Sequence, residues 1–205
     1  MIFEVRSDME PFVKHTGIVV TLDQANIDTD QIIPKQFLKR IERTGFGQYL
    51  FFDWRFLENG DPNPEFALNQ PAAKGATILV ARRNFGSGSS REHAVWALSD
   101  YGFRAVLAPS FADIFYNNCF KNGVLPVALP EDVIETIFQR AATVADYQVT
   151  VNLESLQVTD NQGLSEAFTV DPARRDRMLK GQDDIATTLQ HVDKILAYEQ
   201  AHGIA

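Results

Sequence analysis

The sequence predicts an α/β protein in which crossover helices connect parallel strands, followed by a β-rich flank and a helical C-terminal tail. Short apolar runs alternate with amphipathic helical patterns between residues 76 and 142, and this alternation is typical of parallel strands covered by helices. Runs of β-branched residues follow between residues 147 and 159. Residues 172–200 contain two further helical patterns.

The N-terminal third contains a strand and several irregular segments. Residues 16–22 (TGIVVTL) are rich in β-branched residues and predict a strand, and residues 23–30 (DQANIDTD) predict a polar loop. Pro34 fits the first position of a short helix over residues 35–40, because the N–H that proline lacks would have no partner there. Residues 59–73 hold three of the nine prolines. They predict an irregular connection, which could be a mobile loop.

The central segment has the clearest pattern. Residues 76–81 (ATILVA) form an apolar run suited to a buried strand, and residues 82–89 form a turn rich in glycine and serine. Beyond this turn we expect a helix over 91–101 ending at Gly102, a strand over 104–108, a helix over 111–121 ending at Gly123, a strand over 124–129 and a helix over 131–142.

The C-terminal third predicts a β-hairpin and two helices. Asp171 and Pro172 have the residue types of an N-cap and a first helical position. We expect a hairpin of strands 147–153 and 155–159 around residues 152–154, a helix from 172 to Lys180 that breaks at Gly181, and a last helix over 184–200.

The composition narrows the functional classes. The 205 residues are 45% hydrophobic and carry 19 Lys+Arg against 27 Asp+Glu, for a net charge of −8. This balance disfavours a nucleic-acid-binding protein, and the basic pairs Arg82–Arg83 and Arg174–Arg175 are expected on solvated faces. No apolar run approaches the roughly 20 residues that span a bilayer, and the first ten residues do not resemble a secretory signal. We therefore expect a cytoplasmic protein without a membrane segment.

Cys119 is the only cysteine. One cysteine cannot form an intrachain disulfide, a cysteine-rich zinc site or an iron–sulfur site with three or four cysteine ligands. Because Phe115 and Phe120 lie near it in the predicted helix, we expect an inert thiol in the core. We expect no metal bound by this chain.

The turn over residues 84–93 (NFGSGSSREH) is the most informative stretch. It lies between a predicted buried strand and a predicted helix, where free N–H groups and the helix dipole favour an anion. Gly86 and Gly88 permit positive φ and close approach to a ligand. Ser89, Ser90 and Arg91 offer hydrogen-bond donors to a carboxylate or phosphate.

Two phosphate-binding motifs do not fit this turn. A Walker-type loop needs a Gly-Lys-Ser/Thr sequence, and residues 84–93 contain no lysine. A dinucleotide fingerprint requires a third glycine at the position of Arg91, whose bulk would prevent close packing of helix on strand. The turn therefore favours a small carboxylate ligand.

A structural alternative remains for Ser89. Together with Glu92 it matches a capping box, which stabilises a helix by about 1 kcal/mol without any chemistry. Arg91 argues against this interpretation, because a guanidinium in the first turn opposes the helix dipole. A carboxylate ligand would explain its presence.

Four segments together resemble a known family. Residues 88–94 (GSSREHA) are similar to the signature of the swivel domain in the aconitase superfamily, and residues 28–34 (DTDQIIP) to its upstream motif. The similarity continues through 111–118 (FADIFYNN) and 181–191 (GQDDIATTLQH), so that it covers nearly the whole chain. This combination resembles the small subunits of bacterial 3-isopropylmalate dehydratases. The resemblance implies a single swivelling β/β/α domain over residues 1–205, with C-terminal helices from about residue 172.

The resemblance also implies a reaction and a partner. The family consists of hydro-lyase subunits that isomerise 2- and 3-isopropylmalate by dehydration and rehydration in leucine biosynthesis. A [4Fe–4S] cluster acts as Lewis acid, and since Cys119 alone cannot hold it, a large subunit must supply it in a heterodimer or higher assembly. Ser89 would be the base, with its alkoxide stabilised by helix-terminal N–H groups and cations. Arg91, with Ser90, would bind a substrate carboxylate.

Other residues have two interpretations each. Asp30 either orients a base or arginine or is an ordinary loop aspartate. Lys39 lies where a superfamily relative has a carboxylate-binding arginine, or is a solvated helix lysine. His93 is a proton shuttle, a metal ligand or a structural histidine. The aromatic residues 46–56 (FGQYLFFDWRF) either pack in the core or face substrate or partner.

Two alternative functions remain from the sequence. A related hydro-lyase would use the same scaffold on a homocitrate-type or methyl-substituted malate. A carboxylate-binding module would perform no catalysis and would need no partner that bears a cluster.

Overall fold

A computed structural model describes residues 9–38, 44–189 and 191–204. The strands are β1 (Lys14–Leu22), β2 (Ala76–Ala81), β3 (Ala105–Ala108), β4 (Leu125–Ala128), β5 (Gln148–Asn152), β6 (Gln157–Thr159) and β7 (Ser165–Ala167). They form one seven-stranded sheet in the order β4-β3-β2-β1-β5-β6-β7. Strands β1 to β4 are parallel to one another, whereas β5, β6 and β7 pair in antiparallel fashion.

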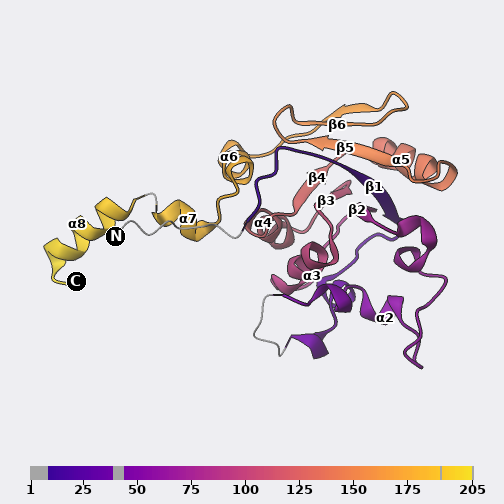
Figure 1. Ribbon diagram of the computed structural model, residues 1–205, viewed down its shortest axis with the longest axis horizontal. Coiled ribbons are helices and arrows are strands. Elements are labelled where there is room, and N and C mark those ends of the chain that lie inside the picture. Colours follow the sequence, from indigo (N-terminus) through magenta and orange to yellow (C-terminus); the bar gives the residue numbers. More distant parts are fainter. Residues whose placement is uncertain (1–8, 39–43, 190, 205) are drawn as a thin grey trace.

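Helices cover both sides of the sheet (Figure 1). They are α1 (Thr29–Ile32), α2 (Phe52–Arg55), α3 (His93–Tyr101), α4 (Asp113–Lys121), α5 (Glu131–Thr143), α6 (Pro172–Lys180), α7 (Asp184–Leu189) and α8 (Val192–His202). Alternate residues of β2 enter two hydrophobic cores, because successive side chains of a strand point to opposite faces. Leu79 packs in the core that includes α3, and Ile78 and Val80 pack in the core that includes α5.

Strand β1 and the order of strands and helices from β2 to β6 confirm the sequence prediction, with ends that differ by one or two residues. Two local predictions near α1 were wrong. Residues 29 and 30, expected at the end of a polar loop over 23–30, belong to the helical turn α1, because the Asp28 side chain accepts hydrogen bonds from the N–H groups of Asp30 and Gln31. Pro34 is the cap rather than the first residue of the next element, which is a short 3₁₀ helix over 35–37.

The C-terminal predictions need two corrections. A third antiparallel strand, β7, extends the predicted hairpin. The single helix expected over 184–200 is instead the two helices α7 and α8. Figure 1 shows both extending away from the body of the molecule. Within the described residues, no helix is long and apolar enough to cross a membrane.

The connection over residues 59–73 is held by asparagine side chains. The Asn63 Nδ2 group donates to the carbonyl of Trp54 (2.9 Å), and Asn69 Nδ2 donates to the carbonyls of Arg55 (2.6 Å) and Asn63 (2.8 Å). These bonds supply partners for backbone groups that no regular element satisfies. Sequence patterns do not show such side-chain contacts, so the sequence predicted an irregular connection and left open whether it is mobile.

The aromatic segment 46–56 contributes to the core. Phe46, Leu50 and Phe51 are completely buried, and Phe46 packs edge-on against the ring of His93. Cys119 is also completely buried, and burial raises the pKa of its thiol well above the usual value. The buried residues of segment 46–56 therefore favour the packing interpretation. The expected position of the Cys119 thiol in the core is confirmed.

A buried carboxylate joins α5 to the antiparallel strands. Asp160 forms an ion pair with Arg140, and its side chain has 0% exposure. It also accepts hydrogen bonds from the Tyr147 hydroxyl (2.6 Å) and from the N–H groups of Gln162 (2.7 Å) and Leu164 (2.8 Å). Burial alone would raise the pKa of Asp160, but these hydrogen bonds outweigh it and lower the pKa.

We predict that Asp160→Ala lowers the free energy of unfolding by about 3 kcal/mol at pH 7, because it leaves the donors of a buried pair without a partner. Since the folded-state pKa lies below the unfolded value of about 3.9, this contribution is complete above that pH. It is lost as the pH falls through the folded-state pKa.

Urea unfolding of parent and variant between pH 2 and 7 measures the difference. Asp176→Ala is the matched control, because its ion pair with Lys180 is exposed and contributes less than about 0.5 kcal/mol. Equal losses in both variants would contradict the role assigned to Asp160.

Candidate functional site

The candidate site lies where the carboxyl ends of β1, β2 and β3 meet. Beyond the regular strands, Asp28 pairs with Ser87 and Phe85 with Phe111 in parallel bridges. The N–H of Gly86 donates to the carbonyl of Ile27 (2.7 Å). Ligand sites of parallel sheets usually lie at this edge, because the loops after neighbouring strands converge there.

Two glycines allow the loops to approach each other. Gly86 has φ 77°, and a Cβ atom there would lie 2.1 Å from Cγ of Phe115. Gly88 has φ 97°, and its Cβ would lie 3.3 Å from Oγ1 of Thr29. The positive φ expected at Gly86 and Gly88 is therefore confirmed, whereas their close approach to a ligand stays a prediction.

The side chain of Ser89 is held by Thr29. The two hydroxyl oxygens are 2.9 Å apart, and the Ser89 N–H donates to Oγ1 of Thr29 (3.1 Å). Thr29 is buried, with 1% exposure. Because Thr29 Oγ1 already accepts the N–H, its own hydroxyl proton is available to Oγ of Ser89. Either hydroxyl can donate in this pair, and with Thr29 as the donor the bond would stabilise an alkoxide at Ser89.

The capping interpretation of Ser89 was wrong. Helix α3 begins at His93, Glu92 is its N-cap, and no side chain makes a capping hydrogen bond there. The capping box of this site belongs to α1, where Asp28 and Gln31 bond each other's backbone N–H groups. The Ser89 hydroxyl therefore has no part in starting a helix.

Arg91 lies beside Asp30. Its guanidinium forms an ion pair with one carboxylate oxygen of Asp30, and Lys35 Nζ lies 3.2 Å from the other. Burial opposes ionisation of Asp30, but the hydrogen bonds from Arg91 and Lys35 outweigh it and lower its pKa. The carboxylate also offsets the charge of Arg91, which lies ahead of the first helical residue, His93. Asp30 thus orients Arg91, as one interpretation of the sequence expected.

A buried asparagine of α4 holds the main chain of the loop over residues 84–93. Asn118 in α4, which is 7% exposed, donates its Nδ2 hydrogen to the carbonyl of Ser90 (3.1 Å). The Ser90 side chain is exposed. Thr29, Lys35 and Asn118 are residues of the site that sequence reasoning did not single out. Thr29 lies inside the motif 28–34 and Asn118 inside the motif 111–118, so these two motifs were the sequence signal that could have identified them.

Of the remaining candidates, His93 lies among the described residues and Lys39 does not. The ring of His93 lies against Phe46 (centroids 5.4 Å) and Trp96 (4.6 Å), and burial followed by the charge of Arg91 lowers its pKa. These ring contacts favour the interpretation of His93 as a structural histidine. Among the residues that the structure describes, no three His, Cys, Asp or Glu side chains converge as metal ligands would. Lys39 lies outside the described residues.

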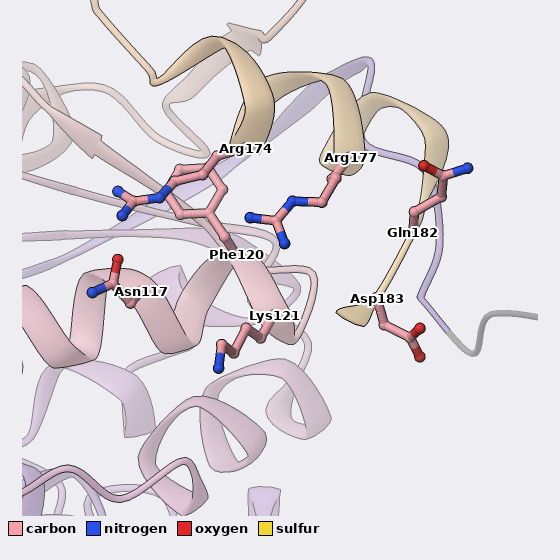
Figure 2. Close-up of a pocket in the computed structure, with 7 residues that line it drawn as sticks. All are labelled: Asn117, Phe120, Lys121, Arg174, Arg177, Gln182 and Asp183. Carbon is pink, nitrogen blue, oxygen red and sulfur yellow. The ribbon is translucent and has the colours of Figure 1, made fainter. Parts of the chain in front are cut away.

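A basic pocket of about 280 Å³ lies elsewhere, between α4 and α6. Figure 2 shows Arg174 and Arg177 reaching from α6 toward Asn117 and Lys121 of α4. The guanidinium of Arg174 lies 5.5 Å from the ring centroid of Tyr116, so it helps to pack the two helices together. None of the residues lining the pocket belongs to the loops at the strand ends, so we do not place the reaction there.

Two other arginines of the basic pairs, Arg82 and Arg175, also make contacts within the protein. Arg82 bonds Asp23 (2.5 Å) and Glu135 (2.7 Å), and it covers the ring of Phe138 (4.0 Å). Arg175 donates to the carbonyls of Leu153 and Glu154 in the hairpin turn. The expectation of solvated faces was right for Arg83, which is exposed, and wrong for Arg82, Arg174 and Arg175, which are partly buried and make these contacts.

Family comparisons match most of the chain. Residues 9–132 match a model described as "Aconitase C-terminal domain", residues 135–172 one described as LeuD_N, and residues 184–202 one described as the C-terminal domain of the 3-isopropylmalate dehydratase small subunit. A 3-isopropylmalate dehydratase small subunit from Rhodopirellula baltica is 67% identical over 95% of this chain and 100% of its own length. A protein of the same name from Brevibacillus brevis is 62% identical over 93% of this chain and 98% of its own length.

A solved structure agrees with the fold. A crystal structure of a 3-isopropylmalate dehydratase protein from Methanocaldococcus jannaschii matches 90% of this chain and 99% of its own, with a TM-score of 0.67 at 22% identity. The predicted class, a swivel-type α/β fold with parallel strands and C-terminal helices, is confirmed. On these matches, the chain belongs to the 3-isopropylmalate dehydratase small-subunit family of the aconitase superfamily.

Proposed function

We propose that this chain is the small subunit of a hydro-lyase that isomerises 2-isopropylmalate and 3-isopropylmalate in leucine biosynthesis, with Ser89 as its catalytic base. The observation that carries the proposal is the hydroxyl pair of Ser89 and Thr29 next to the ion pair of Arg91 and Asp30. A proton acceptor and a carboxylate-binding cation thus stand side by side at the carboxyl ends of parallel strands. The choice of this reaction rests on the family to which the chain belongs.

In this proposal Ser89 removes the proton from a substrate carbon. A serine hydroxyl is too weak an acid to ionise unaided, so its alkoxide needs donors and positive charge nearby. The Thr29 hydroxyl is one such donor, because an alkoxide at Ser89 can only accept and the two oxygens are 2.9 Å apart. Arg91, two residues further on, supplies the charge. Rehydration would return the proton from the same oxygen to the neighbouring carbon.

Substrate binding is assigned to Arg91 with Ser90. The Asp30 contact uses one end of the planar guanidinium, and the other N–H groups can bind a carboxylate in two-point fashion. The hydroxyl of the exposed residue Ser90 adds a second hydrogen-bond donor next to Arg91 in the chain. The main chain of Ser90 is held by the hydrogen bond from Asn118. Lys39 is proposed as a second substrate-binding cation on its family position alone. Gly86, Gly88 and Asp30 support the loop.

This chain does not fit an iron–sulfur cluster. Its one cysteine is completely buried, and the described residues offer no other cluster of ligands. We propose that the [4Fe–4S] cluster lies in a large subunit, which completes the active site in a heterodimer or higher assembly. In keeping with this role, we propose a cytoplasmic protein with a single swivel domain over residues 1–205, without nucleic-acid or membrane partners.

A related substrate is the second candidate. The groups that bind carboxylates would serve homocitrate-type or methyl-substituted malates equally well, because they do not contact the side chain that distinguishes these acids. Comparing kcat/KM for isopropylmalate and methylmalates in the reconstituted complex distinguishes the two proposals. A preference for a methylmalate would favour the alternative.

The isolated chain is expected to be colourless and inactive, because it lacks cluster ligands. Absorption spectroscopy and a dehydratase assay, with and without the purified large subunit, test this expectation. Turnover by this chain alone would overturn the assignment of the cluster to the partner.

Ser89→Ala is expected to lower kcat in the reconstituted complex by roughly 10²–10⁴-fold, because it removes the proton acceptor. The melting temperature should change little, since the variant loses only the contacts with Thr29, worth about 1 kcal/mol. Ser87→Ala, in the same loop, is the matched control and should retain activity. Near-normal turnover by Ser89→Ala would rule out its catalytic role.

Arg91→Lys is expected to lower kcat/KM by about 10- to 100-fold, although it keeps the charge. Lysine cannot bond Asp30 and a substrate carboxylate with one planar group, and a lost charge-assisted bond costs about 1.5–3 kcal/mol. Arg83→Lys, at an exposed position, serves as control. A value for Arg91→Lys within twofold of the parent would show that Arg91 does not bind the substrate.

A further inference from the structure

The basic pocket between α4 and α6 contains polar side chains that the candidate active site does not use. Its volume is about 280 Å³. The described residues that line it include three cations, Arg174, Arg177 and Lys121, and one carboxylate, Asp183. The lining is therefore basic, although the chain as a whole has a net charge of −8. Hollows lined mainly by one sign of charge attract small ions of the other sign.

Two arginines of the pocket lie on one face of α6. Arg177 follows Arg174 by three residues, so the two side chains are neighbours on the helix surface. Figure 2 shows their guanidinium groups and the Asn117 amide of α4 around the same gap between the helices. Like charges at this spacing repel each other. An anion in the gap would offset that repulsion.

Helix α6 is held in place at both ends. The Asp171 side chain caps its first turn, and Met178 near its last turn is completely buried. The N–H of Phe12 donates to the carbonyl of Met178 (2.9 Å). Gly181, with φ 64°, ends the helix where a Cβ atom would lie 2.5 Å from the carbonyl oxygen of Met9. The arginines of α6 are therefore positioned by the fold, which lowers the cost of binding a ligand.

Two hydrogen-bond donors of the pocket have no protein acceptor among the described residues. The Arg174 guanidinium lies 5.5 Å from the ring centroid of Tyr116 and 5.8 Å from that of Phe120, and no described carboxylate forms an ion pair with it. Within the same part of the chain, the Asn117 amide donates no hydrogen bond. Ring contacts leave the N–H groups of a guanidinium available to oxygen acceptors.

The donors and the size of the pocket indicate a small oxyanion. A guanidinium donates two parallel N–H groups to a phosphate or a carboxylate, and the Asn117 amide can donate one more hydrogen bond. Pockets that enclose drug-sized ligands measure roughly 300–1,000 Å³. The volume of about 280 Å³ lies below this range, so it suits inorganic phosphate or a short carboxylic acid better than a nucleotide.

We propose that the pocket between α4 and α6 binds a small oxyanion, a phosphate or a carboxylate, through Arg174, Arg177 and Asn117. The site is separate from the loop with Ser89 and Arg91, and none of its residues has a part in the proposed reaction. The anion contacts both helices and so fastens α6 to α4. Because the unfolded chain has no such site, the bound anion stabilises the folded protein.

The test titrates the full chain with inorganic phosphate and with succinate, by calorimetry and by thermal unfolding. We expect at least one of them to bind with a Kd of about 1 mM or lower and to raise the melting temperature. The tighter ligand identifies the site as one for phosphate or for carboxylate. Sodium chloride at equal ionic strength is the control for general screening. An equal rise with all three salts would show that no specific site exists.

Three variants locate the bound anion. Arg174→Gln removes a charge-assisted bond, and Asn117→Asp places a carboxylate in the gap with little change of shape, so each should raise the Kd at least about tenfold. Asn117→Asp keeps the test valid if Arg174→Gln loosens α6. Lys180→Gln is the matched control, because it removes one positive charge from an exposed position of α6 outside the pocket. Its Kd should stay within twofold of the parent.

The same titration distinguishes this site from the candidate active site. Arg91→Lys should leave the Kd within twofold of the parent, whatever acid the complex converts. Weaker binding in Arg91→Lys, with parent-like binding in Arg174→Gln, would place the anion at the candidate active site and overturn the proposal. So would equal Kd values for Asn117→Asp and Lys180→Gln, or a parent chain that binds neither anion at about 10 mM.

Discussion

The main-chain hydrogen bonds between the loop after β1 and the loop after β2 determine where every polar group of the candidate site lies. Ile27 accepts from the N–H groups of Gly86 and Ser87, and the N–H of Thr29 donates to the carbonyl of Ser87 (2.8 Å). These bonds continue the parallel pairing of the strands beyond their regular ends. Because they bring residue 29 next to residue 89, the hydroxyl pair and the ion pair form without any further adjustment of the chain.

The packing of the sheet maintains this arrangement. Gly86 lies so close to the ring of Phe115 that only hydrogen fits in place of a side chain. Phe115 and Asn118 both belong to α4, so one helix supports the loop through an apolar contact and a hydrogen bond to Ser90. The reactive groups are thus carried on rigid strand ends and a buried helix. Ser90 is exposed and Ser89 and Arg91 are partly exposed, which agrees with our proposal that a large subunit completes the site.

Two ion pairs of this protein differ in their surroundings and in the role that we assign to each. The pair of Arg140 and Asp160 lies under the antiparallel strands, and every described partner of Asp160 is a structural donor. In the pair of Arg91 and Asp30 the carboxylate is more exposed, and among the described residues only Asp30 is seen to accept from the guanidinium. The same ion-pair chemistry therefore gives a fixed cross-link at one place and, in the function that we propose, a binding group at the other.

The sequence by itself determined the class of the fold, the order of its central elements and the motif with Ser89 and Arg91, because hydrophobic periodicity and turn residues are local signals. It also excluded an iron–sulfur site in this chain through its single cysteine. Only the tertiary structure decided that Ser89 bonds Thr29 rather than caps α3, and that Asp30 pairs with Arg91. These partners are separated by about 60 residues in the chain. Contacts over such a distance depend on strand pairing, which no local pattern specifies.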